Sequence, residues 1–103
     1  MAEAEINAGI CGYTTRVTAS RPPEGERVLL TISSGCPWVQ KMAADLSEVD
    51  PMREITYRGE GPQVLAAARL LRHPACPVPS GILRAVEIAA GLALPKDMQI
   101  KLE

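Results

Sequence analysis

The chain has few aromatic residues and no long apolar run. It contains no Phe, one Trp and two Tyr in 103 residues, so a platform of aromatic rings for stacking nucleic-acid bases is not expected. No segment reaches the ~20 apolar residues that a membrane-spanning helix needs. The short acidic N-terminus lacks the basic and apolar regions of a secretory signal. We therefore expect a cytoplasmic protein that binds neither nucleic acid nor a membrane.

No run of like charges stands out either. Eleven basic and twelve acidic residues give a net charge of -1, and a nucleic-acid-binding face would require the scattered arginines to converge in space. The hydrophobic share of 47% and the charged share of 22% are typical of globular proteins. A chain of this length fits one domain with its own core, so we expect a single domain over residues 1–103.

Hydrophobic periodicity predicts the secondary structure. Alternation of apolar and polar residues predicts strands at 3–10, 13–19, 28–32, 54–58 and 98–102. Apolar residues at helical spacing predict helices at 37–49, 62–72 and 80–93. The strand–helix–strand unit over 28–58 suggests parallel pairing through a right-handed crossover. The expected fold is α+β, a mixed four- to five-stranded sheet packed by three helices in the order βββαβααβ.

Three cysteines are the residues with the clearest chemical potential. Their odd number leaves at least one outside any disulfide, and in a reducing compartment all three are expected as free thiols or ligands. Each precedes a Gly or Pro that interrupts regular structure, and a His-x-x-Cys spacing precedes the last of them. Thiolates and imidazole suit zinc or an iron–sulfur cluster, and a proline also follows the last ligand of bacterial ferredoxin runs. The predicted metal ligands are Cys11, Cys36 and Cys76, with His73 as the candidate fourth.

Three functions are compatible with this pattern. The first is the holding, transfer or sensing of an iron–sulfur cluster, or of zinc, with a protein partner for the transfer. The second is a metal-free protein-interaction or regulatory domain whose cysteines only pack, since free cysteine is often buried. The third is a thiol redox enzyme using Cys36, because Pro37 suits a first helical position and the helix end would favour the thiolate. His73 taken alone is more typical of a cation near a helix C-terminus than of a metal ligand.

Residues 28–57 resemble the C-terminal scaffold domain of NifU-type iron–sulfur assembly proteins. The resemblance rests on Ser34–Pro37 between a predicted strand and helix, followed by Asp50–Pro51 and a further predicted strand. It implies a strand–helix–strand unit with a Cys-x-x-Cys-Pro motif whose two thiols bind a transferable cluster. Cys36 matches the second cysteine of that motif, and Ser33 stands where the first would be.

The whole chain, through Ala8–Gly12 and Cys76–Gly81, resembles a small uncharacterised domain family of anaerobic prokaryotes. This second resemblance supplies no activity. It favours an iron–sulfur role, because cells without oxygen keep exposed clusters more easily.

Overall fold

A computed structural model describes all 103 residues of the chain. It contains a four-stranded sheet, four α-helices and one 3₁₀ helix, which confirms the α+β class. The elements follow in the order β1 (Ala2–Asn7), β2 (Thr14–Ser20), β3 (Val28–Ser34), α1 (Pro37–Ala43), β4 (Glu48–Val49), α2 (Pro51–Glu54), α3 (Gln63–Ala67), η1 (Ala68–Leu70) and α4 (Val78–Ala89). None of the helices combines the length and the apolar content needed to cross a bilayer.

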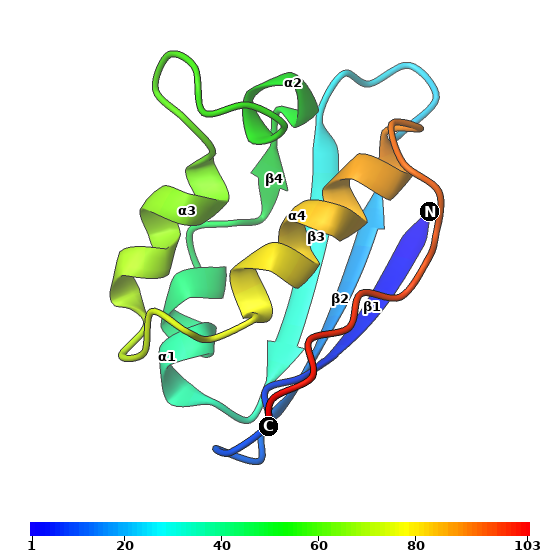
Figure 1. The fold of residues 1–103 in the computed structure, drawn as a ribbon. Coiled ribbons are helices and arrows are strands. Elements are labelled where there is room, and N and C mark those ends of the chain that lie inside the picture. The colour runs from blue at the N-terminus through cyan, green and yellow to red at the C-terminus, as the bar shows by residue number, and fades with distance from the viewer.

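The sheet is antiparallel throughout, with the strand order β1-β2-β3-β4 (Figure 1). Val17 in β2 is opposite Ala4 on one side and Ile32 on the other. The parallel crossover predicted over 28–58 is wrong, because α1 already carries the chain back toward the start of β3. The two residues of β4 therefore pair with that start in the opposite direction, with Val49 opposite Val28.

The strand predicted at 54–58 is also wrong, because a capped helix takes the start of that segment. The Asp50 carboxylate accepts a hydrogen bond from the Met52 amide at 3.0 Å, and Pro51 occupies the first position of α2. Such a cap satisfies amides that a helix otherwise leaves without partners. The local cap therefore prevails over the apolar alternation that suggested a strand.

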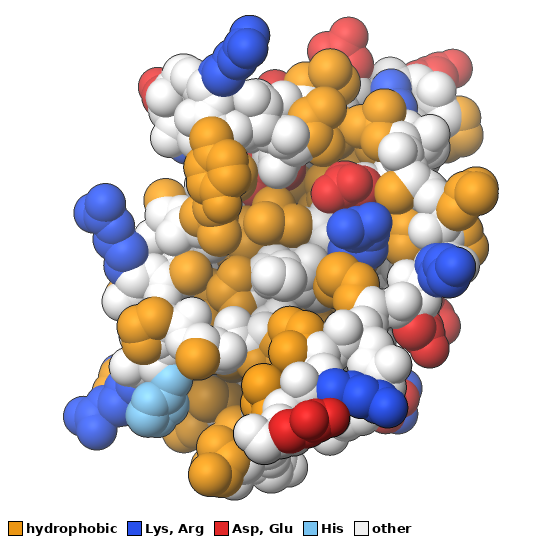
Figure 2. All heavy atoms as spheres, viewed as in Figure 1, with side chains coloured by type: hydrophobic (Ala, Val, Ile, Leu, Met, Phe, Trp, Pro, Cys, Tyr) orange, Lys and Arg blue, Asp and Glu red, His pale blue; other side chains and the backbone are white.

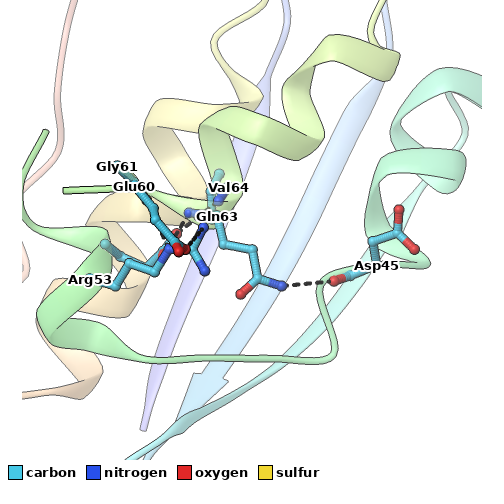
Figure 3. Close-up of polar contacts among 7 residues, drawn as sticks. Asp45, Arg53, Glu60, Gly61, Gln63 and Val64 are labelled. Carbon is cyan, nitrogen blue, oxygen red and sulfur yellow. Dashed lines mark hydrogen bonds and ion pairs between the residues drawn. The ribbon is translucent and has the colours of Figure 1, made fainter.

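A buried carboxylate then fixes the loop that follows α2. The two oxygens of Glu54 accept hydrogen bonds from the amides of Gln63 and Val64, both at 2.8 Å, at the start of α3. Arg53 donates to the Gly61 carbonyl at 2.9 Å. Figure 3 shows how these contacts join α2 to the start of α3 across the intervening loop. Glu54 is only 4% exposed, so this carboxylate serves as a buried helix cap.

The remaining helices differ from prediction mainly at their ends. The helix predicted at 37–49 stops at Ala43, and that predicted at 62–72 is the short α3 continued by η1. The third predicted helix, at 80–93, is α4, which starts two residues earlier and ends at Ala89. The predicted last strand at 98–102 is exposed and pairs with no other strand.

The core lies between the sheet and the helices that cover one face of it (Figure 1). Helix α4 packs on β1 and β2, while α1 packs on β3. A Cβ atom at Gly81 would collide with the side chain of Ile6, so glycine there lets α4 approach β1 closely. The other face of the sheet is polar and exposed, with Glu3, Glu5 and Arg16 on it. The buried apolar residues are Ala2, Ile6, Val17, Ala19, Val28, Leu30, Val39, Met42, Leu46, Val49, Val64, Val78, Ile82, Ala85 and Val86.

Candidate functional site

The three segments that carry the cysteines meet at one end of the sheet, which we call the cysteine end. It comprises the β1–β2 turn (8–13), the β3–α1 junction (34–37) and the loop before α4 (71–77). Thr15 pairs with Ser34, so the turn before β2 lies beside the junction after β3. Gly81 meets Ile6 near the end of β1, so the loop before α4 reaches the same end. Figure 1 shows all three segments in the lower half of the molecule.

Hydrogen bonds fix the backbone around Cys36. The Ser34 hydroxyl accepts from the Cys36 amide at 3.1 Å and from the Thr15 hydroxyl at 2.8 Å. The Gln40 side chain donates to the Ser34 carbonyl at 2.8 Å. Cys36 is the N-cap residue of α1, as predicted, and is half-buried against the core. However, α1 has only seven residues. The positive end of so short a helix gives little support to the expectation of a thiolate at Cys36.

Cys11 lies in the β1–β2 turn and is exposed. Gly9 and Gly12 give this turn its shape, with φ angles of 87° and 77° that other residues rarely adopt. The ring of Tyr13 packs against Gly35, where an added Cβ would lie 3.2 Å from the ring. The tyrosine therefore joins the Cys11 turn to the junction that holds Cys36.

Cys76 and His73 lie together in the turn before α4. The Cys76 amide donates to the His73 carbonyl at 3.1 Å. Cys76 is half-buried and packs against the core, whereas His73 is exposed. The preceding residue, Arg72, places its guanidinium carbon 4.8 Å from the centre of the Trp38 ring. This contact connects the Cys76 loop to α1, two residues after Cys36.

The predicted ligands thus share one end of the sheet, but they are not assembled around an ion. Three thiols and an imidazole are chemically suited to zinc or an iron–sulfur cluster. No group of three or more His, Cys, Asp or Glu side chains lies close enough to hold a metal ion. All three cysteines are free thiols. A metal site formed by Cys11, Cys36, Cys76 and His73 stays a prediction, and it does not fit the observed arrangement without movement.

A hollow of about 380 Å³ lies away from the cysteines, between the β2–β3 loop and the start of α2. Two of its charged side chains serve the fold. Arg21 donates to the carbonyls of Gly25 at 3.3 Å and Ala90 at 3.4 Å, and Asp50 caps α2. The hollow therefore offers few polar groups that are free for a ligand.

A cluster of cations around the only tryptophan was not predicted from the sequence. The ammonium of Lys41 lies 4.7 Å from the centre of the Trp38 ring, and Arg72 approaches the same ring. The pairing with Lys41 could have been found, because residues three apart on a helix are neighbours. The pairing with Arg72 depends on the packing of η1 against α1, which no local pattern indicates.

Fold and site together define a small α+β domain with an antiparallel sheet, one helical layer and free thiols at one end. The chain belongs to a family of unknown function, DUF6951, whose model matches residues 2–102. No curated protein and no solved structure matches the chain. The local similarity to the NifU-type scaffold domain therefore gains no support from relatives, and α2 stands where that unit would place its second strand.

Proposed function

We propose that this protein is a metal-free interaction or regulatory domain of the cytoplasm whose half-buried cysteines, Cys36 and Cys76, have structural roles. The supporting observation is that Cys36 and Cys76 pack against the core while no metal-ligating group forms around them. Free cysteine behaves as a small apolar residue in such positions. The two thiols then help to pack the β3–α1 junction and the loop before α4 against the sheet.

The exposed surface of the cysteine end supports a binding role. Ile10 is fully exposed beside Cys11, and Tyr13 is 41% exposed. Trp38, with its two cations, lies on the adjacent surface of α1. Aromatic and Arg residues are enriched in protein–protein interfaces. This end thus combines apolar and basic side chains that a partner protein could contact.

Metal analysis of the anaerobically expressed protein tests the structural role of the cysteines. We expect the wild type, after reconstitution with iron and sulfide or with zinc, to retain no more metal than the Cys36→Ser variant. Retention of one zinc ion or one cluster per chain, lost in Cys36→Ser, would contradict the proposal. The Cys76→Ser variant checks the structural role independently of metal. We expect it to be less stable than the wild type whether or not metal is present, because a thiol packed against the core is replaced by a hydroxyl.

A crosslinker attached to Cys11 tests the interaction role. Cys11 is the only exposed cysteine, so a photoreactive maleimide reaches it first. We expect a discrete adduct with a partner in a native extract. The matched control carries Cys11→Ser and Glu24→Cys, which moves the crosslinker to the exposed β2–β3 loop. The same adducts from both positions, or none from Cys11, would count against a partner at the cysteine end.

Metal binding is the second candidate function, and the shared location of the three cysteine loops favours it. Zinc or an iron–sulfur cluster would be held by Cys11, Cys36 and Cys76, with His73 as fourth ligand and a protein partner for transfer. The local resemblance to NifU-type scaffolds also supports it. The thiols of Cys36 and Cys76 would first have to turn away from the core, so the reconstitution experiment separates the two functions.

A further inference from the structure

The cations beside Trp38 have no acidic partner in the folded chain. The three ion pairs of the molecule are Arg16–Glu5, Arg27–Glu48 and Arg53–Glu60. Lys41 and Arg72 form none of these pairs and instead lie over the half-buried Trp38 ring. A cation over an aromatic ring keeps its charge while its side chain loses freedom. The tryptophan cluster of Trp38, Lys41 and Arg72 is therefore a preorganised, uncompensated positive site.

The surrounding sequence extends this positive region. Residues 31–44 and 61–86 contain no Asp or Glu, although they carry Lys41 and Arg72 together with Arg69, His73 and Arg84. The first acidic residue after α1 is Asp45, which is exposed and forms no ion pair with these cations. The overall charge of -1 therefore does not exclude a positive site at the tryptophan cluster, whose two cations lie in acid-free stretches of the chain.

Acidic residues lie elsewhere in the molecule, in segments that also carry Arg21, Arg27, Arg53 and Arg58. They occupy the β2–β3 loop, the start of α2 and the loop after α2, at Glu24, Glu26, Asp50 and Glu60. Figure 2 shows acidic and basic side chains together along the upper edge, and a basic side chain beside the histidine at the lower left. The C-terminus lies at the lower end as well, and with it Glu103 (Figure 1).

We propose that the tryptophan cluster binds an acidic peptide segment of a partner protein. This inference rests on the proposed interaction function and assigns that function a surface and a partner chemistry. Arg72 can present two parallel N–H donors to one carboxylate, and Lys41 supplies a second positive charge nearby.

An acidic peptide fits this surface better than a nucleic acid. A protein that binds nucleic acid tightly contacts about six to ten phosphates, whereas this surface holds only a few cations. Two of those cations already lie over the one tryptophan ring, which limits its use for base stacking. The acidic residues elsewhere on the domain would repel an extended polyanion but would not oppose a short acidic segment.

Trp38 is the only tryptophan, so its fluorescence reports binding at the cluster directly. The probe is a fluorescein-labelled peptide of about twelve residues, rich in Asp and Glu with one Leu and no Trp. We expect metal-free protein to bind this peptide with a change in Trp38 emission, and the affinity to fall as salt rises from about 50 to about 500 mM. The double variant Lys41→Gln/Arg72→Gln should weaken binding about tenfold or more.

The matched control is Arg58→Gln/Lys96→Gln, which removes the same charge from exposed positions outside the cluster. We expect less than about a threefold loss of affinity from this variant. No binding, an equal loss in both variants, or tighter binding of single-stranded oligothymidine would overturn the proposal. Metal content is measured on the same preparations. A protein that binds metal would refute the proposed function, whereas a metal-free protein that does not bind the peptide would refute only the peptide site.

Discussion

The two ends of the molecule use their polar residues differently. At the end that holds α2, charged side chains bind backbone groups: Glu54 caps α3, Arg53 binds the Gly61 carbonyl, and Arg21 binds the Ala90 carbonyl. At the cysteine end, uncharged Ser34 and Gln40 hold the backbone, and Lys41 and Arg72 bind neither backbone nor carboxylate. Charges engaged in the fold are unavailable to partners, so the cysteine end is the better candidate for recognition.

The largest effect on stability is expected at the α2 end. Glu54→Ala leaves the amides of Gln63 and Val64 without acceptors in a buried position, and we expect a loss of about 3 kcal/mol in the free energy of unfolding. Urea unfolding followed by circular dichroism measures it. The control is Glu60→Ala, whose exposed ion pair should contribute less than about 1 kcal/mol. If Glu54→Ala lost no more than this control, the buried cap would not hold the loop.

The contact between α4 and β1 is expected to be next in size. Gly81→Ala places a methyl group against Ile6 and should cost about 1–3 kcal/mol through overpacking. The double variant Ile6→Val/Gly81→Ala should recover part of the loss, because the shorter side chain makes room for the methyl group. Strictly additive effects of the two substitutions in urea unfolding would show that Gly81 and Ile6 are not coupled.

A smaller effect is expected at the β3–α1 junction. Ser34→Ala removes the acceptor for the Cys36 amide and the partner of the Thr15 hydroxyl, so we expect a loss of about 1 kcal/mol. We also expect Cys36 to react faster with a thiol reagent in a Cys11→Ser background, because a looser junction exposes it more often. Ser33→Ala, at an exposed position of β3, is the control. Equal reaction rates in the two variants would mean that Ser34 does not fix Cys36.

The smallest effect on stability is expected at the tryptophan cluster. Lys41→Gln and Arg72→Gln should each change the free energy of unfolding by less than about 1 kcal/mol, because both cationic residues are exposed. The difference between the two ends predicts that these variants lose peptide binding while they keep their fold. A loss of more than about 2 kcal/mol in urea unfolding would place these cations among the groups that maintain the structure.

Much of the fold could be predicted from local sequence patterns. The alternation in β1, β2 and β3 and the proline at the start of α1 were sufficient to place those elements. The alternating pattern at 54–58 wrongly predicted a strand. Asp50 caps a helix just before this segment, and Glu54 is buried through its contacts with the start of α3, which no local pattern indicates. The pairing of β4 with β3 was missed because it depends on where α1 ends.

The candidate site was predictable in part. Alternation and turns indicated that Cys11 and Cys36 lie beside strand ends, and hairpin pairing then brings those ends together. Whether a thiol points outward or packs inward depends on the assembled core, which is why the burial of Cys36 and Cys76 could not be read from spacing. The approach of Arg72 to Trp38 likewise requires η1 to pack on α1.

The free edge of β1 has a consequence for self-association. β1 pairs only with β2, so one side of its backbone is open to another strand. If two copies met there in antiparallel fashion with Ala4 opposite Ala4, Glu3 of each would face Glu5 of the other across the polar face of the sheet. Like charges opposite each other destabilise such pairing, and charged edge strands resist edge-to-edge growth. The acidic residues of β1 therefore protect the domain from aggregating through its own sheet.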